Sequence, residues 1–345
     1  MNIGEIARLA GVSRSTVSYA LSGKRPISPE TRARIQAVID ELDYQPSAAA
    51  RALSSGRTRT LGLVFPPAGS HYTDMQLDFI GSLVEAAAGF GYDVLLAAAA
   101  AAAGDGRQGL RRLVAERRVD GAVLMEIRLD DARVDHLAAA GFPFVTIGRV
   151  GAPERTRWVD LDYTALVGSC VSHLAQLGHR RIALVNRSER LFRAGYESAH
   201  RSLTGFQDAC AEHGVIGTAH LCGDDAASGE DAIDRILAAD PGTTALVTVN
   251  EAALGGLYRG LAAHGRRIPR DFSVAGIAAG RWAAAVTPQL TAADVPAVEM
   301  GRVAVELLLE LLATPDAPPR HFLLNPPVSL RASTGPAPAP ADVAG

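Results

Sequence analysis

The stretch RSTVSYALSGKR, residues 14–25, carries hydroxyl and arginine side chains on what its pattern predicts to be a short helix. Ser13 stands before it in the position of an N-cap. Val17 marks the inward face of this helix, so Arg14 and Tyr19 are expected to point outward. A polar and basic helix face so near the N-terminus predicts a partner outside the protein core.

The neighbouring segments complete a motif around this helix. A first helix is expected over residues 3–10, and Gly11 separates it from the second. A third helix is expected to begin at Pro29, with Ser28 as its cap. Two helices joined by a short turn, the second polar and outward, form a helix-turn-helix, whose second helix enters the DNA major groove. A three-helix cap with a merely solvated face is disfavoured, because spacing, caps and charge agree on DNA.

Charge divides the chain into a basic head and an acidic body. Residues 1–60 contain nine Lys or Arg and five Asp or Glu, whereas the remainder contains 25 and 32. The 345-residue length and the 48% apolar content predict two or three domains with a large core. A small basic head on a larger acidic body suggests a module that binds a polyanion.

The expected compartment is the cytosol. Three cysteines without a CxxC pair indicate reduced thiols. The N-terminal MNIGEIARLAG contains Glu5 and Arg8 and lacks the apolar core of a signal peptide. No apolar run approaches the ~20 residues that span a bilayer, so no membrane partner is expected.

The body alternates short apolar runs with helical stretches. Helices are expected between strands, and this alternation predicts two α/β lobes with doubly wound parallel sheets. The strands are expected at residues 60–66, 92–98, 119–126, 142–148, 180–186, 244–250 and 272–278. A GxGxxG pattern at 104–109 is separated from its strand by alanines, so no dinucleotide is expected. No other cofactor or metal is expected, since HExxH and CxxC motifs are absent.

Three motifs resemble the head of LacI/GalR-type bacterial transcription regulators. The chain contains AxxAGVSxxTVSxxL, ISxETRxRI and YxPxxxARxL, and the resemblance continues to about residue 334. It implies an all-α helix-turn-helix head on a periplasmic-binding-protein-like body of two lobes. The implied divisions are a DNA-binding domain over 1–46, a hinge helix or linker over 47–58, an effector-binding and dimerisation domain over 59–334 and a disordered tail over 335–345.

The resemblance also implies which residues meet DNA. Positions that read bases fall on Arg14, Ser15 and Tyr19, and an arginine can donate two bonds to guanine. The segment PSAAARAL resembles a hinge helix that inserts a leucine into the minor groove. The alternative is that this segment is a plain alanine-rich linker. Residues that suit phosphate or hinge contacts are Ser13, Thr16, Ser18, Ser28, Arg51 and Leu53.

The resemblance further implies a small-molecule effector between the lobes and the positions that would bind it, and this place agrees with the rule that ligands bind at the carboxyl ends of parallel strands. Glu251 stands where the family usually has Asp, and Ala278 replaces another carboxylate. Carboxylates with an aromatic face suit a sugar or sugar derivative, although a nucleobase or another metabolite stays open. The candidate residues are Tyr72, Asp74, Glu126, Arg149, Asp160, Phe192, Arg201, Glu251 and Trp282.

The resulting hypothesis is a homodimeric regulator, usually a repressor, that binds a pseudo-palindromic double-stranded operator. The effector would change its affinity for that operator. The alternative is a solute-binding protein of a transport system, which predicts a signal peptide and no basic head. An enzyme on the same fold is disfavoured because no nucleophile or metal motif is present.

Overall fold

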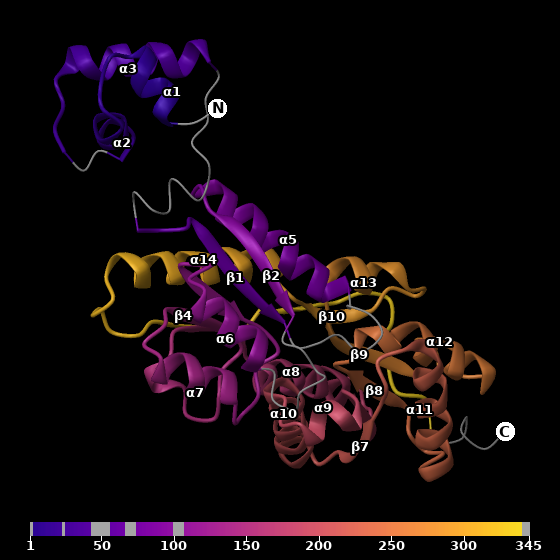
Figure 1. The fold of residues 1–345 in the computed structure, drawn as a ribbon. Helices are drawn as coiled ribbons and strands as arrows, with labels where there is room; N and C mark the ends of the chain where they lie inside the picture. The colour runs from indigo at the N-terminus through magenta and orange to yellow at the C-terminus, as the bar shows by residue number, and fades with distance from the viewer. Residues whose placement is uncertain (1–2, 23–24, 43–55, 66–73, 99–106, 340–345) are drawn as a thin grey trace.

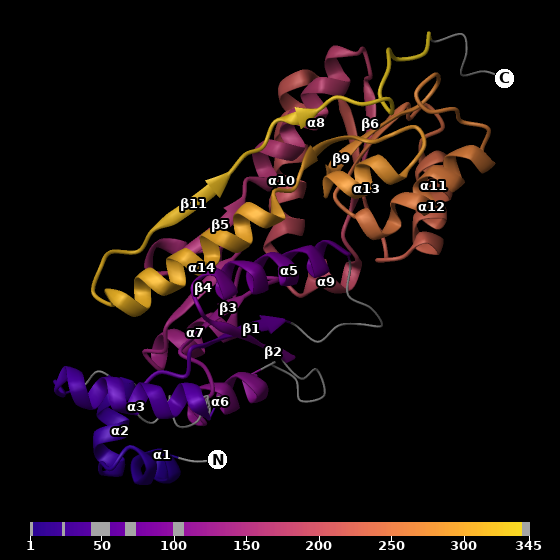
Figure 2. The ribbon, with the colours of Figure 1, turned by 90° about the horizontal axis from the view of Figure 1, so that it is seen from above.

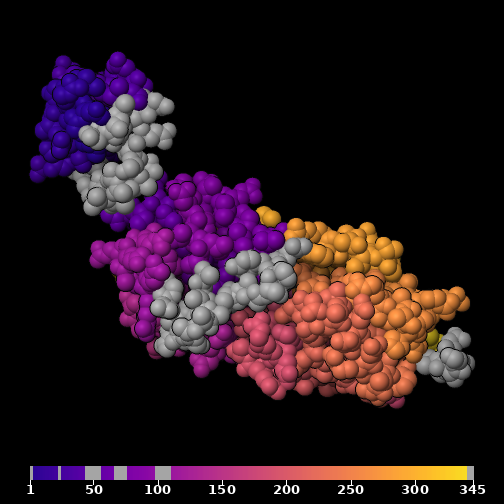
Figure 3. Space-filling model, turned by 45° about the vertical axis from the view of Figure 1, so that its right-hand side comes forward, coloured from indigo at the N-terminus to yellow at the C-terminus, as the bar shows by residue number. Residues whose placement is uncertain are grey.

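A computed structural model describes residues 3–22, 25–42, 56–65, 74–98 and 107–339. Figures 1 and 3 show a small helical head beside a larger, elongated body. The head consists of α1 (Ile3–Leu9), α2 (Arg14–Ser22) and α3 (Pro29–Glu41).

The head has a small apolar core of its own. Ile6, Val17 and Ile35 are each at most 1% exposed and pack against one another. Gly11 turns the chain between α1 and α2 with a φ of 63°, a left-handed conformation that glycine adopts at no steric cost. The predicted helix-turn-helix is therefore confirmed as a packed unit.

The first lobe is built on a six-stranded parallel sheet in the order β11-β5-β4-β3-β1-β2. Its strands are β1 (Thr60–Phe65), β2 (Asp93–Ala98), β3 (Gly121–Leu124), β4 (Phe144–Ile147), β5 (Trp158–Leu161) and β11 (His321–Leu324). Two helices cover each face, as Figure 2 shows: α5 (Asp74–Gly89) with α14 (Ala297–Ala313), and α6 (Arg107–Ala115) with α7 (Ala132–Ala139). The strands are buried because helices lie on both sides.

The second lobe repeats this plan with the order β12-β10-β9-β8-β6-β7, in which only β12 runs antiparallel to its neighbour. Its strands are β6 (Arg181–Asn186), β7 (Ile216–Leu221), β8 (Ala245–Thr248), β9 (Ser273–Ala278), β10 (Thr291–Asp294) and β12 (Val328–Ser329). Its helices are α8 (Tyr163–Gln176), α9 (Glu189–Arg193), α10 (Glu197–His213), α11 (Ala226–Ala239), α12 (Leu254–Ala263) and α13 (Gly280–Ala285). Short 3₁₀ turns occupy Pro153–Arg155 and Glu251–Ala253.

The chain passes between the lobes three times, after β5, after β10 and after β11. The lobes also touch away from these crossings. The amide of Leu129 donates to the carbonyl of Gly195 at 2.8 Å, and the amide of Glu197 donates to Ile127 at 3.0 Å. The carboxyl ends of both sheets therefore meet across one boundary.

All seven expected strands are present, and the expected two-lobed architecture is confirmed. Five further strands and the helices α9, α13 and α14 were not anticipated. The expected disordered tail needs a correction at its start. Gly335 accepts a hydrogen bond from Ser273 or His179, and the Ala337 amide donates to Leu177 at 2.8 Å, so these residues are held on the second lobe.

Candidate functional site

The outer face of α2 presents the side chains predicted to read DNA. Arg14 and Ser15 are exposed. The Ser13 hydroxyl accepts a hydrogen bond from the amide of Thr16 at 3.1 Å, which caps the helix and fixes its start. The polar side chains of this first turn are thereby held in place at the surface, where they can reach a duplex.

Tyr19 lies one turn further along the same helix and is half-buried. The guanidinium of Arg25 stands over its ring, 5.4 Å from the centroid. Ser28 caps α3 by accepting from the amide of Thr31 at 3.2 Å. The predicted hinge residues Arg51 and Leu53 lie outside the described residues.

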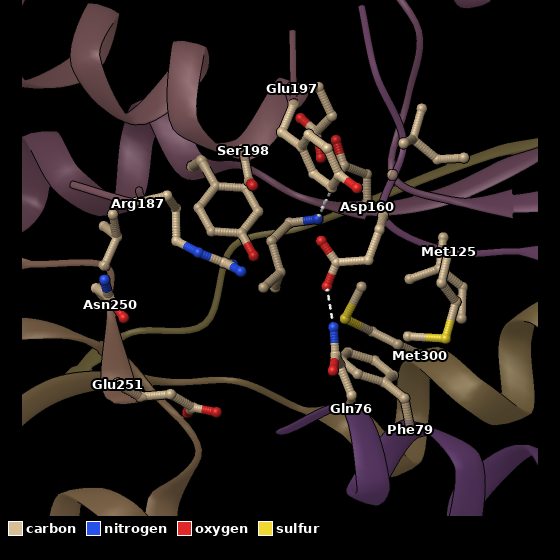
Figure 4. Close-up of a pocket in the computed structure, with 18 of the residues that line it drawn as sticks. Gln76, Phe79, Met125, Asp160, Arg187, Glu197, Ser198, Asn250, Glu251 and Met300 are labelled. Atoms are coloured by element: carbon tan, nitrogen blue, oxygen red, sulfur yellow. Dashed lines mark hydrogen bonds between the residues drawn. The ribbon is translucent and has the colours of Figure 1, made fainter. Parts of the chain in front are cut away.

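A cavity between the two lobes collects the polar strand ends of both sheets. Figure 4 shows Gln76, Phe79 and Met300 on one side, and Arg187, Asn250 and Glu251 on the other. The first lobe contributes from α5, α14 and the ends of β3, β4 and β5, and the second from the ends of β6 and β8 and the start of α10. The charged and polar side chains that line the cavity are Gln76, Glu126, Asp160, Tyr163, Arg187, Tyr196, Glu197, Ser198, Asp224, Asn250 and Glu251.

Arg187 and Asn250 are polar side chains that the second lobe brings to this cavity. The Nε of Arg187 lies 3.6 Å from a carboxylate oxygen of Asp224. Burial lowers the pKa of Arg187, but the charges of Glu126 and Asp224 outweigh it and raise that pKa. The amide of Asn250 donates to the carbonyls of Cys222 and Gly223, at 2.9 and 3.1 Å. Both residues are therefore held in place by their surroundings.

Glu126 enters the cavity from the first lobe on an unusual backbone. Its φ is 54°, a left-handed value that is uncommon for a residue other than glycine. Arg133 donates to the Glu126 carbonyl at 2.8 Å, and its guanidinium donates two further bonds to the Asp131 carboxylate. The side chain of Gln76 donates to the Glu126 carboxylate at 2.8 Å. This network orients the carboxylate toward the cavity.

Two buried carboxylates lie where the lobes meet, each beside an arginine. Asp160 Oδ2 is 2.9 Å from Arg149 Nε, and Glu197 Oε2 is 2.9 Å from Arg201 Nε. Burial raises the pKa of Asp160 to about 7, although the charges of Arg149 and Arg201 oppose this. Burial and the charge of Asp160 raise the pKa of Glu197 well above its usual value. The pair therefore retains protons at a pH where ordinary carboxylates have lost them.

The structure brings three of the predicted effector residues to the cavity, namely Glu126, Asp160 and Glu251. Arg149 and Arg201 lie behind its wall, where they pair with Asp160 and Glu197 as described. Tyr72 lies outside the described residues, as does the side chain of Asp74, which begins α5.

The predicted aromatic faces require a correction. Phe192 stacks on His200 with ring centroids 4.2 Å apart, and Trp282 packs on the apolar core of the second lobe. Neither lines the cavity, because each ring is already covered by its own lobe. Among the described residues, the aromatic side chains that do line it are Phe79, Tyr163 and Tyr196.

Several lining residues were missed although a signal for them exists. Arg187 directly follows the strand β6, and Asn250 lies two residues after β8. Since ligands collect at the carboxyl ends of parallel strands, both positions could have been nominated by that rule alone. Phe79 and Met300 carry no such signal, because helices deliver them from distant parts of the chain.

Comparisons with known proteins now identify the family. The model "Bacterial regulatory proteins, lacI family" matches residues 2–47, and "Periplasmic binding protein-like domain" matches residues 171–334. The HTH-type transcriptional regulator CelR of Thermobifida fusca is 31% identical over 344 residues, covering 95% of this chain and 96% of CelR. The chain belongs to the LacI family. It is a DNA-binding transcriptional regulator, a member of a non-enzymatic family.

Solved structures agree with this family membership. A complex of the regulator CelR with cellobiose superposes with a TM-score of 0.72 at 26% identity, covering 96% of this chain and 99% of that one. The lac repressor dimer bound to operator and the anti-inducer ONPF gives 0.83 at 22% identity, covering 97% and 99%, which supports the fold. In the part of the chain that the structure describes, no helix is both long and apolar enough for a membrane crossing.

Proposed function

We propose that this LacI-family regulator is a repressor whose operator affinity is set by a sugar or sugar derivative in the cavity between its lobes. The observation that carries this proposal is the convergence of carboxylates, amides and one guanidinium from both lobes on one cavity. Carboxylates accept hydrogen bonds from hydroxyl groups, while amides and guanidinium donate to hydroxyl and ring oxygens. The complex of the related CelR with cellobiose supports the same ligand class.

The DNA-binding role is assigned to the head and the hinge. Arg14, Ser15 and Tyr19 would meet bases, and the hinge leucine Leu53 would enter the minor groove beside Arg51. The residues assigned to phosphates are Ser13, Thr16, Ser18 and Ser28. The exposure of Arg14 and Ser15 on α2 supports this assignment.

We assign the effector site to the cavity residues together with residues of the segment before α5. Glu126, Asp160 and Glu251 would accept hydrogen bonds from the ligand, while Arg187 and Gln76 would donate to it. The residues Tyr72 and Asp74 belong to the same proposal, as do Arg149 and Arg201 as partners of the buried carboxylates.

The regulator is proposed to act as a homodimer on a pseudo-palindromic operator in the cytoplasm, associated with the nucleoid. The helices α5 and α14 pack together and leave Leu77, Val84 and Val298 between 46% and 71% exposed. Such apolar side chains suit a second copy of the chain. Closure of the lobes would change the distance between the linkers (residues 47–58) of the two subunits. The two heads (residues 1–46) would then gain or lose their simultaneous contact with DNA.

The experiment is a titration of cellobiose and other uncharged sugars into the complex of the full chain with its operator. A sugar that shifts operator affinity should lose its effect in the double variant Glu126→Ala, Glu251→Ala, while DNA binding without sugar is kept. Glu230→Ala, an exposed substitution on α11, is the control and should keep the response. A response retained by the double variant would place the effector elsewhere.

A further inference from the structure

The cavity contains far more acidic than basic side chains. Among the described residues, its only lining cation is Arg187. The lining carboxylates are Glu126, Asp160, Glu197, Asp224 and Glu251. Ionised carboxylates accept hydrogen bonds and donate none, so this set is complementary to a ligand that supplies hydrogen-bond donors.

The arginines behind the wall are already engaged. Arg149 pairs with Asp160 and Arg201 pairs with Glu197, each at 2.9 Å. Arg201 also donates to the carbonyls of Arg149 and Val150, at 3.4 and 3.3 Å. Their guanidinium groups therefore compensate charges of the protein and are not available to compensate the charge of a ligand.

A count of the full set leaves the site negative. Three arginines face five carboxylates, so the set carries a net charge of −2 when all five carboxylates are ionised, and of −1 while Glu197 keeps its proton. The segments 66–73 and 99–106, PPAGSHYT and AAAAAGDG, contain neither lysine nor arginine. No fixed cation from these two segments can therefore reverse the balance.

The pKa shifts of two groups at the cavity, Tyr163 and Arg187, agree with a negative potential there. Burial raises the pKa of Tyr163, and the charges of Glu197, Asp160 and Glu126 raise it further. The pKa of Arg187 is raised by neighbouring carboxylates despite its burial. Each shift has the direction that a negative field imposes on a nearby titratable group.

From this geometry we propose that this cavity, the cleft between the two lobes, selects an uncharged, hydroxyl-rich ligand and excludes phosphorylated and carboxylated ones. The inference rests on the proposed function, since it specifies the charge of the effector at that same site. Hydroxyl groups can donate to Glu126, Asp224 and Glu251 and accept from Arg187, while Phe79 and Met300 provide an apolar wall. A phosphate would meet the carboxylates at short range in a partly desolvated site, where repulsion between like charges is strong.

The first test is calorimetric titration of the full chain with inorganic phosphate and with matched pairs of sugars. The pairs are glucose with glucose 6-phosphate and galactose with galactose 6-phosphate, beside cellobiose and gluconate. We expect no saturable binding of phosphate, of gluconate or of either phosphorylated sugar. Saturable binding of any of these anions that is lost in Arg187→Gln would overturn the inference.

The second test removes the charge that should exclude anions. The isosteric double variant Glu126→Gln, Glu251→Gln should bind inorganic phosphate at least about tenfold more tightly than the wild type. Glu306→Gln carries the same change on the surface of α14 and should not differ from the wild type. If the double variant does not fold, Glu126→Gln alone should move in the same direction by a smaller factor. An unchanged phosphate affinity in a folded variant would contradict the inference.

The outcomes separate the two proposals. If no uncharged sugar binds while phosphate binds only to the double variant, the sugar assignment fails and the exclusion of anions stands. If a phosphorylated sugar binds and shifts operator affinity, the sugar assignment stands and the charge inference fails.

Discussion

The head and the cleft hold their polar side chains in opposite ways. On α2, Arg14 and Ser15 are exposed and ready for a partner outside the protein. In the cleft, Asp160 and Glu197 are 1% and 4% exposed and are paired with arginines. A substitution in the head should therefore change recognition with little cost in stability, whereas a substitution in the cleft should affect both.

The largest effect is expected from breaking a buried ion pair in the cleft. Arg149→Met leaves Asp160 without its nearest cation, and loss of one partner of a buried pair costs about 3–5 kcal/mol. Arg302→Met breaks an exposed pair on α14 and should cost no more than about 1 kcal/mol. Urea unfolding of the full chain at pH 8 measures both, and equal losses would refute the distinction.

The pH dependence of stability provides the next test. Asp160 keeps its proton up to about pH 7 when folded, but loses it near its ordinary value of 3.8 when unfolded. Between these two pH values the folded state therefore binds more protons than the unfolded state. The contribution of Asp160 to the free energy of unfolding falls as the pH rises through this window, by up to about 4 kcal/mol. Asp160→Asn should flatten this part of the curve, measured by urea unfolding at several pH values. A variant curve parallel to the wild type would count against the raised pKa.

The head offers a smaller effect that should stay local. Ile35→Ala opens a cavity among Ile6, Val17 and their neighbours and should destabilise the head by about 2–3 kcal/mol. DNA binding should weaken accordingly, while the unfolding of the two lobes keeps its midpoint. Calorimetric melting that showed the lobes destabilised as well would mean that head and body do not fold as separate units.

The smallest predicted effect concerns recognition alone. Arg14→Ala should weaken binding to the preferred operator by about 1–3 kcal/mol and weaken binding to random DNA much less. The melting temperature of the protein should not change, since Arg14 is exposed. Gel-shift titrations at one fixed salt concentration measure both affinities. Equal losses on both DNAs would reduce Arg14 to a phosphate contact.

The same contrast explains what the sequence could predict. The face proposed to meet DNA lies within residues 13–19, at the start of one short helix, so caps and periodicity predicted which side chains point outward, and the family resemblance implied their roles. The cavity draws on residues from Gln76 to Met300, and only the strand-end rule links such positions before the fold is known. Rings such as Phe192 could not be placed, because whether a ring faces the cavity or its own lobe depends on tertiary packing.

The chain's course between the lobes was also beyond local patterns. The helix α14 returns to the first lobe after β10, and β11 and β12 then add one edge strand to each sheet. Short runs such as β12 are fixed by pairing with a distant neighbour rather than by their own sequence. The central strands of both sheets, by contrast, were predicted from the sequence, because strands that are buried on both faces appear as continuous apolar runs.

The measurement that tests the central claim most directly is selection of genomic DNA fragments by the purified full chain, with and without uncharged sugars. The account predicts enrichment of one pseudo-palindromic sequence, and a change of that enrichment when the effector sugar is added. Retention of fragments without any shared sequence, in every condition, would contradict a sequence-specific repressor controlled through the cleft.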